Sequence, residues 1–401
     1  MHPAASAILQ SGADVCKYAW ELALVTGSHG AELYPLTLHP QAVEKVWGGR
    51  ELARLFDFRL PAEAPIGEVW TAWDGLTVSN GPACGKTLAQ LVRDQPSAVF
   101  GSATGAGDPK SFPLLAKFLH ARENLSIQVH PDDDGARRLE QQLLGKSEMW
   151  YVVAAEPGAI VWHGPKRALS SDELQVALQA GRIPELLQQV DVFPGDVLIN
   201  PPGTIHALGR GIVIFELQQS SDLTYRLFDW DRATGAGPPR ALHLEQGLAV
   251  ADLVPSARHK IEPVTFAEDG WRRQILGACR HYAAELWELT GAPVALPTNG
   301  RFQILTTLTG RLVVSSRASA RPPMTLPSGY SVVIPAEETD VTLAAATPTC
   351  QVFRSYVPNL AVDLVAPLRS RGIADAAILQ LGGDPARSDL RFALEQGGIA
   401  H

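Results

Sequence analysis

Residues 126–133 read Ser-Ile-Gln-Val-His-Pro-Asp-Asp, a short alternating stretch that ends on a histidine followed by a proline. Because successive side chains of a β-strand point to opposite faces, Ser126, Gln128 and His130 are expected to share one face. The proline breaks the strand directly after the histidine. The stretch therefore predicts a strand that brings an amide and an imidazole to the same side of a sheet.

Two further groups are placed to join that face. Glu148 opens the apolar strand of residues 148–153, and His206 follows the turn of residues 201–204. Two imidazoles, a carboxylate and an amide oxygen match the ligand preferences of a borderline metal ion, with zinc first by ligand type. The sequence therefore predicts a metal site whose four ligands are Gln128, His130, Glu148 and His206.

The overall composition is that of a globular protein large enough for two or three domains. The chain has 401 residues, of which 46% are hydrophobic and 19% are charged, and its formal net charge is −8. Partners such as nucleic acid or an anionic membrane require a basic face, so we expect neither. A local basic pocket for a small anion remains compatible with this charge.

Cysteine usage and hydropathy predict a cytoplasmic protein. The four cysteines are far apart and form no C-x-x-C pair, so neither a disulfide framework nor a cysteine zinc site is expected. No apolar run reaches the roughly 18–20 residues of a membrane span. The N-terminus lacks the basic start of a signal peptide.

Short strands separated by tight turns dominate the chain, and several carry His, Glu or Gln. This pattern favours a mainly β fold of two jelly-roll, or cupin, β-barrels with a few short helices. Residues 87–100 have the spacing of one helix, and Ser170 with Glu173 predicts a capping box at the start of another. Residues 132–146 and 242–252 are also expected to hold short helices.

The predicted domain layout follows from these elements. Residues 1–32 are an N-terminal extension, and residues 33–255 form a metal-binding catalytic domain with a helical insertion at about 170–190. Residues 256–360 form a second, degenerate cupin without a matching His-x-His or Gln-x-His pair. Residues 361–401 form a tail that we expect to be loosely ordered.

The spacing of several motifs is specific. Gly195, Pro201, Gly203 and His206 have the spacing of the second cupin motif, and the pair Gln128-x-His130 followed by Glu148 is similar to the first, with glutamine replacing its first histidine. Together with QVHPDD, GKSEMWY, PPGTIHALG and ELQQSSDLTYRLFDWDR, these segments resemble type I mannose-6-phosphate isomerase in its shorter bacterial form. The resemblance spans roughly residues 33–356 and is strongest over residues 112–232.

The resemblance implies one Zn²⁺ per chain, held by the four ligands named above. It also implies the interconversion of mannose 6-phosphate and fructose 6-phosphate through a cis-enediol, in carbohydrate metabolism. The substrate is then a small-molecule sugar phosphate, and a monomer or a homodimer is expected.

The resemblance further assigns basic groups to the pocket. Lys146 and Arg226, with Asp222 four residues before the arginine, are the expected catalytic residues. Lys117, Arg226 and Ser126 are expected to bind the substrate and its phosphate. Longer members carry a histidine before the pocket lysine, where this chain has Gly145, so no acid or base role transfers from it.

Plainer interpretations remain open for each of these residues. Every ligand could be a buried polar group of the core, Lys117 an edge-strand lysine that reaches solvent, and Lys146 a solvated loop residue. Arg226 could pair structurally with a nearby aspartate. The general base could be Lys146 with Asp222, or a metal-bound water. The chain could also be a sugar-phosphate sensor, or a metal enzyme for another sugar phosphate.

Overall fold

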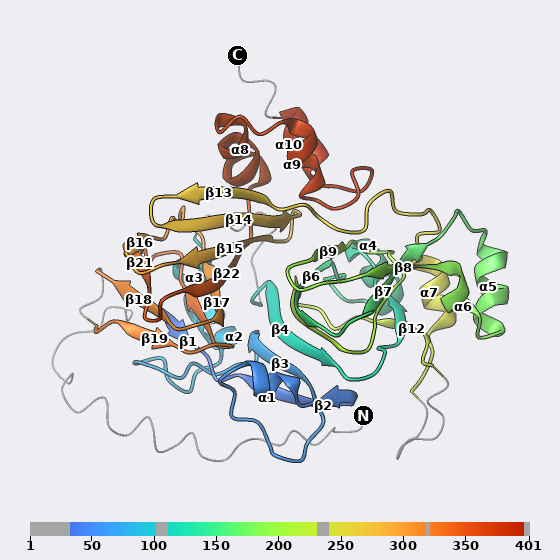
Figure 1. Ribbon diagram of the computed structural model, residues 1–401, viewed down its shortest axis with the longest axis horizontal. Coiled ribbons are helices and arrows are strands. Elements are labelled where there is room, and N and C mark those ends of the chain that lie inside the picture. Colours follow the sequence, from blue (N-terminus) through green and yellow to red (C-terminus); the bar gives the residue numbers. More distant parts are fainter. Residues whose placement is uncertain (1–32, 102–110, 231–239, 318–320, 397–401) are drawn as a thin grey trace.

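The computed structural model describes residues 33–101, 111–230, 240–317 and 321–396. Within these residues four antiparallel sheets form two β units that lie side by side (Figure 1). The predicted mainly β class is therefore confirmed. The predicted N-terminal extension of residues 1–32 lies outside the described residues.

The first β unit consists of two facing sheets. The six-stranded sheet has the order β2-β3-β4-β11-β6-β9, and its strands are β2 (Gln41–Gly49), β3 (Ile66–Ala72), β4 (Leu114–Ala121), β6 (Glu148–Ala155), β9 (Val197–Asn200) and β11 (Ile212–Gln219). The five-stranded sheet has the order β12-β5-β10-β7-β8, with β5 (Ile127–Val129), β7 (Ile160–Pro165), β8 (Leu187–Asp191), β10 (His206–Leu208) and β12 (Tyr225–Phe228).

The second β unit pairs a seven-stranded sheet with a four-stranded one. The larger has the order β1-β20-β17-β22-β15-β14-β13, with β1 (Leu36–Thr37), β13 (Val264–Glu268), β14 (Trp271–Ala278), β15 (Ala283–Leu289), β17 (Gln303–Thr309), β20 (Ser331–Ile334) and β22 (Cys350–Tyr356). The smaller has the order β16-β21-β18-β19, with β16 (Val294–Ala295), β18 (Leu312–Ser316), β19 (Met324–Leu326) and β21 (Val341–Ala345). Strand β1 ties the start of the described chain to this unit.

The six-stranded sheet separates a dry face from a charged one. On its outer face, Phe118 and Phe215 pack together, and Phe215 meets Phe353 of the second unit with ring centroids 4.6 Å apart. Their sequence neighbours Lys117 and Glu216 point to the opposite face, because side chains alternate along a strand. The apolar contact between the units thus leaves the interior of the first unit for polar chemistry.

Short helices connect and cover the sheets. They are α1 (Glu51–Leu55), α2 (Leu88–Asp94), α3 (Pro96–Phe100), α4 (Asp133–Glu140), α5 (Ser171–Gln179), α6 (Ile183–Leu186) and α7 (Leu244–Val250). The expected capping box at Ser170 and Glu173 is present. The single helix expected over residues 87–100 is wrong, since Pro96 disfavours a helical conformation at Gln95 and begins a new helix.

The expectation of a loosely ordered tail is also wrong for residues 360–396. A π-helical turn η2 (Leu360–Val365) and the helices α8 (Ala366–Ser370), α9 (Asp375–Gln380) and α10 (Leu390–Gln396) lie beside β13 and β14 (Figure 1). Their apolar residues Leu364, Leu368, Ile378 and Leu390 are buried. The sequence suggested disorder because its apolar residues are spread over helices of only one or two turns.

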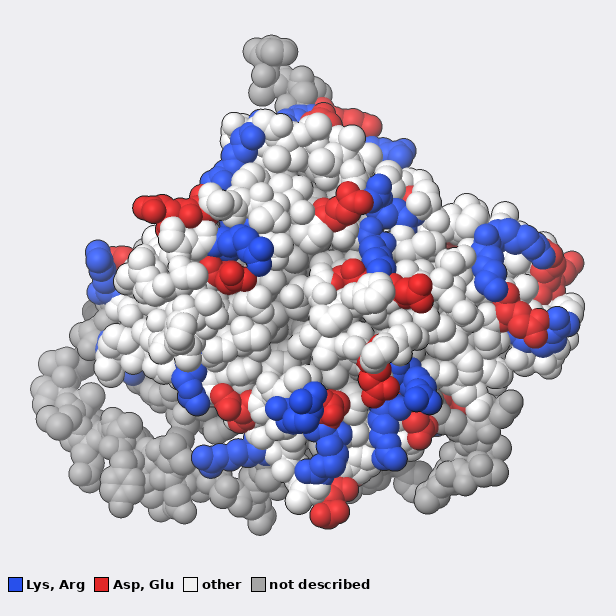
Figure 2. Space-filling model, viewed as in Figure 1, with Lys and Arg blue, Asp and Glu red and all other residues white. Residues whose placement is uncertain are grey.

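Three other features bear on the sequence expectations. Cys279 and Cys350 are free and buried. No helix among the described residues is long and apolar enough to cross a membrane. Figure 2 shows acidic and basic side chains interspersed on the visible face of the molecule.

Candidate metal centre

Strand pairing brings the four predicted ligands together inside the first β unit. Gln128 on β5 lies directly opposite His206 on β10, and His130 follows the last residue of β5. Glu148, the first residue of β6, reaches toward them from the facing six-stranded sheet. The register of β5 and β10 thus sets Gln128 beside His206, and the packing of the two sheets brings Glu148 to them.

The contacts of these side chains are short. His206 Nε2 lies 3.1 Å from Glu148 Oε1, and His130 Nε2 lies 3.4 Å from Glu148 Oε2. Gln128 Nε2 lies 3.3 Å from His206 Nε2. One ligand atom each from His130, Glu148 and His206 can be chosen so that all three lie within 4.8 Å of one another. The three side chains are almost completely buried.

The hydrogen bonds of the two imidazoles fit a bound cation. His130 Nδ1–H donates to the Leu223 carbonyl and His206 Nδ1–H donates to the Thr204 carbonyl, each over 2.8 Å. In a neutral ring this leaves the Nε2 lone pair facing the Glu148 carboxylate. His130 Nε2 has no hydrogen-bond partner among the described residues. The Nε2 lone pairs of His130 and His206 and the Glu148 carboxylate face one another, and a cation between them would relieve their mutual repulsion.

The protonation states agree with this interpretation. Burial, with the charge of Lys146, lowers the pKa of His130 to about 3, so its imidazole is neutral at pH 7. Burial alone would raise the pKa of Glu148, but chiefly the charge of Lys146 holds that pKa well below its ordinary value. Metal binding requires deprotonated ligands, and these groups meet that condition. Gln128 would offer its Oε1 after a half-turn of the amide, which exchanges its oxygen and nitrogen positions.

A row of charges borders the ligands on the six-stranded sheet. Lys117 on β4 lies opposite Glu216 on β11, and its Nζ is 3.3 Å from Glu216 Oε1 and 3.6 Å from Glu68 Oε2. Burial would lower the pKa of Lys117, but the carboxylates of Glu216 and Glu68 raise it above its ordinary value. Lys117 is thus a buried cation on a central strand and does not reach solvent from an edge.

Lys146 is buried next to the predicted ligands. Its Nζ lies 2.9 Å from Glu148 Oε2 and 3.7 Å from Glu216 Oε1, and its side chain is only 5% exposed. Its backbone N–H donates to the Pro131 carbonyl over 2.9 Å, which ties it to the segment that carries His130. The alternative of a solvated loop lysine therefore does not describe Lys146.

Arg226 lies beside the cluster on β12 and is partly buried. It lies opposite Gln128 in the pairing of β12 with β5, and its Nε donates to Ser126 Oγ over 3.3 Å. Its Nη1 donates to the Ala241 carbonyl over 2.9 Å. Asp222 is exposed, and its negative charge acts on Lys117. Arg226, Ser126, Gln128 and His206 thus lie on one wall of the interior, and Glu148 faces them from the other.

Two residues of this interior were missed in the sequence. Glu216 and Glu68 are buried carboxylates that hold Lys117 from both sides. Burial, with the negative charge of Glu148, raises the pKa of Glu216, whereas Lys117 and Lys45 outweigh burial and lower the pKa of Glu68 to about 2. One signal was available, since Glu216 is the single charge in an apolar run and a buried charge requires a partner.

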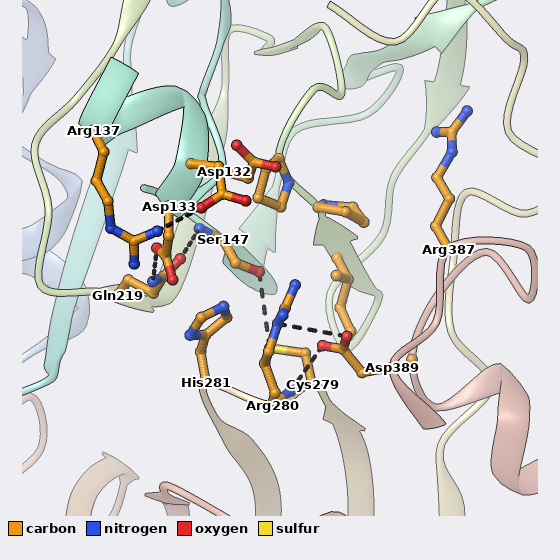
Figure 3. Close-up of a pocket in the computed structure, with 15 residues that line it drawn as sticks. Asp132, Asp133, Arg137, Ser147, Gln219, Cys279, Arg280, His281, Arg387 and Asp389 are labelled. Atoms are coloured by element: carbon orange, nitrogen blue, oxygen red, sulfur yellow. Dashed lines mark hydrogen bonds and ion pairs between the residues drawn. The ribbon is translucent and has the colours of Figure 1, made fainter. Parts of the chain in front are cut away.

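A separate cavity of about 240 Å³ lies behind this cluster. Its walls come from the start of α4, the Cys279–His281 turn of the second unit, and residues 382–389 (Figure 3). Ser147 faces this cavity and bonds Tyr282 Oη at 3.3 Å, while its neighbours Lys146 and Glu148 face the interior of the first unit. The cavity is lined by none of the four predicted ligands, so we do not assign the substrate to it.

Comparison with known proteins identifies the family. A family model described as "Phosphomannose isomerase type I, catalytic domain" matches residues 36–156. The mannose-6-phosphate isomerase of Streptococcus mutans serotype c is 36% identical over 281 residues, which cover 69% of this chain and 85% of that protein. The chain belongs to the type I phosphomannose isomerase family.

Two further relatives support the assignment. Mannose-6-phosphate isomerase ManA of Bacillus subtilis (strain 168) is 37% identical over 264 residues, covering 64% of this chain and 80% of that protein. The crystal structure of the mannose 6-phosphate isomerase from Bacillus subtilis matches with a TM-score of 0.73 and 32% identity, over 80% of this chain and 99% of that chain. The expected family, isomerase class and cupin-type fold are therefore confirmed.

Proposed function

We propose that this phosphomannose isomerase interconverts mannose 6-phosphate and fructose 6-phosphate at the cluster of Gln128, His130, Glu148 and His206. One observation carries the proposal. Two imidazole Nε2 atoms and a buried carboxylate converge beside two buried lysines, in a chain whose relatives bear the name of this activity. The proposed setting is the cytoplasm, and the proposed assembly is a monomer or a homodimer.

The proposed cofactor is one Zn²⁺ per chain. Two imidazoles, a carboxylate and an amide oxygen suit zinc, although other divalent ions accept the same donors. A divalent ion held there would polarise the carbonyl oxygen of the open-chain sugar as a Lewis acid. Asn200 supports the set, since its Nδ2 donates to Glu148 Oε1 over 3.0 Å and orients that carboxylate.

The residues of the chain are proposed to handle the proton. The reaction removes a proton from C2 of the open-chain aldose and returns it to C1. Lys146 is the proposed group for this transfer: its neutral amine would take the C2 proton, Glu148 and Glu216 would hold the resulting ammonium, and the same proton would return to C1. Arg226 would stabilise negative charge on the enediol oxygens from the facing sheet. Asp222 is the proposed carboxylate at the rim of the same interior.

Arg226 is also the proposed anchor of the phosphate. A guanidinium presents two parallel N–H donors to a phosphate, and Arg226 is only partly buried. Lys117 is enclosed by two carboxylates, so we assign it to a sugar oxygen more than to the phosphate. Ser126, which accepts a hydrogen bond from Arg226 Nε, would position the arginine and the substrate together.

A coupled assay of fructose 6-phosphate formation tests the proposed function. We expect the metal-stripped protein to be inactive, the zinc-restored protein to be active, and the His206→Ala variant to remain inactive while folded. A folded, zinc-loaded protein that binds mannose 6-phosphate without converting it would instead be a sensor. Conversion of a different sugar phosphate would show that the substrate is wrong, while the proposed metal site would remain supported.

A further inference from the structure

Trp150 links a predicted metal ligand to the charged row. It is almost fully buried in β6, two residues after Glu148, and its Nε1–H donates to Glu216 Oε2 over 3.2 Å. Its ring meets the His206 imidazole edge-on, with centroids 5.3 Å apart and planes at 81°. The indole therefore contacts both the predicted metal ligand His206 and Glu216, the counter-ion of Lys117 and Lys146.

Glu216 depends on this contact for its orientation. Glu216 Oε1 lies 3.3 Å from Lys117 Nζ and 3.7 Å from Lys146 Nζ. This oxygen has no hydrogen-bond partner among the described residues. The hydrogen bond from Trp150 fixes Oε2 on the other side of the carboxylate. Because the two oxygens of a carboxylate are equivalent, only a partial rotation would take an oxygen away from both lysines, and the hydrogen bond from the indole N–H opposes that rotation.

Strand register makes this arrangement part of a longer row. Trp70 on β3 lies opposite Lys117, Lys117 lies opposite Glu216, and Glu216 lies opposite Trp150. At the far end Trp70 Nε1 donates to Glu68 Oε2 over 2.6 Å. Each carboxylate that holds Lys117 is thus itself held by an indole N–H, an uncharged donor that a largely apolar residue can bring into a dry interior.

We propose that Trp150 is a positioning residue for the isomerisation, and that it acts by holding Glu216 Oε1 toward Lys117 and Lys146. The inference rests on the proposed function, because that function assigns substrate binding and proton transfer to the two lysines. Trp150 itself touches no reacting atom in this account. Its removal should slow the chemical step without weakening metal binding.

The test compares two tryptophan-to-phenylalanine variants of the full zinc-loaded chain. Trp150→Phe keeps an aromatic ring near His206 and removes the N–H donor. Trp162→Phe is the matched control, since Trp162 is also buried in the first unit and its Nε1 has no hydrogen-bond partner among the described residues. Trp150→Phe should lower kcat roughly 10- to 100-fold, as expected for the loss of a hydrogen bond to a charged group, with KM and zinc content unchanged.

A double-mutant cycle shows whether the effect passes through Glu216. Exchange of the C2 hydrogen of mannose 6-phosphate for solvent deuterium, followed by NMR, measures the proton-transfer step even in slow variants. In a Glu216→Ala background, Trp150→Phe should cause no further loss. The proposal would be overturned by additive losses of kcat in the cycle or by an unchanged kcat in Trp150→Phe. It would also be overturned by an equal loss of kcat in Trp162→Phe, or by loss of zinc from Trp150→Phe.

A crystal structure of Trp150→Phe gives a readout that does not depend on activity. The Glu216 carboxylate should turn so that neither of its oxygens faces both Lys117 and Lys146. An unmoved carboxylate would overturn the positioning role. Absence of isomerase activity in the wild-type protein would contradict the proposed function. The orientation of Glu216 in the Trp150→Phe crystal would still show whether Trp150 positions that carboxylate.

Discussion

Glu285 is the centre of a buried ion cluster in the second β unit, and its loss should destabilise the protein. Its carboxylate accepts two hydrogen bonds from Arg273, at 2.9 and 2.7 Å, and one from Arg354 Nη1 at 3.1 Å. Trp287 Nε1 and Tyr356 Oη donate to it as well, at 2.7 and 3.3 Å. The Glu285 side chain is 1% exposed and that of Arg354 is 3% exposed.

The size of the effect follows from the pKa of this carboxyl group. Burial would raise it, but Arg354 and Arg273 outweigh burial and lower it from 4.5 to about 2. A difference of about 2.5 pKa units at about 1.4 kcal/mol each gives about 3 kcal/mol of stability. Glu285→Gln keeps the shape of the side chain but leaves the guanidinium of Arg354 buried without its counter-ion. Broken buried ion pairs cost about 3–5 kcal/mol, which agrees.

The same shift predicts how the effect changes with pH. The folded-state pKa of Glu285 is lowered, so its stabilisation is complete above the unfolded value of 4.5 and is lost as the pH falls through about 2. Roughly half of it should remain at about pH 3. The difference in stability between wild type and Glu285→Gln should therefore be constant near neutrality and become smaller in acid.

Denaturant unfolding followed by tryptophan fluorescence measures these differences. Glu288→Gln is the matched control, because Glu288 lies on the same strand and pairs with Arg272 at 2.9 Å, with side chains 31% and 48% exposed. Exposed pairs contribute about 0–1 kcal/mol, so the control should be nearly neutral. An equal, small loss of unfolding free energy in both variants would refute the role of Glu285, and so would a loss in Glu285→Gln that does not shrink in acid.

Two further predictions concern the first unit. Arg226→Lys should raise KM for mannose 6-phosphate roughly 10-fold or more, since a lysine makes no bidentate contact with phosphate. Steady-state kinetics on protein with unchanged zinc content would check this. An unchanged KM would show that Arg226 does not bind the phosphate. Lys117→Met should lower the free energy of unfolding by about 3–5 kcal/mol in thermal unfolding, because Glu68 and Glu216 lose their shared cation. Adding Glu216→Gln should restore part of that loss. Equal stability of the single and double variants would contradict the pairing.

The convergence of the four candidate ligands was predictable from the sequence, whereas their role as metal ligands stays a prediction. Alternation along residues 126–130 places Gln128 and His130 on one face, and the structure has them there, with His206 opposite Gln128. The capping box at Ser170 was predictable because its contacts are local. Short-range geometry and motif spacing were sufficient for these features.

The charged row could not be predicted in the same way. Lys117 and Glu216 each stand alone in an apolar run, and their pairing depends on the order β4-β11-β6, which joins strands almost one hundred residues apart. Trp150 resembles any core aromatic until its register opposite Glu216 is known. The fold of residues 360–396 was missed because burial against β13 and β14, and not local sequence, stabilises those short helices.

Diffraction from crystals of the zinc-loaded enzyme at the zinc absorption edge tests the central claim most directly. We expect one strong anomalous peak per chain, lying among the Gln128 amide, the Nε2 atoms of His130 and His206, and the Glu148 carboxylate. A peak elsewhere in the molecule, or no peak in protein that is fully active, would contradict it.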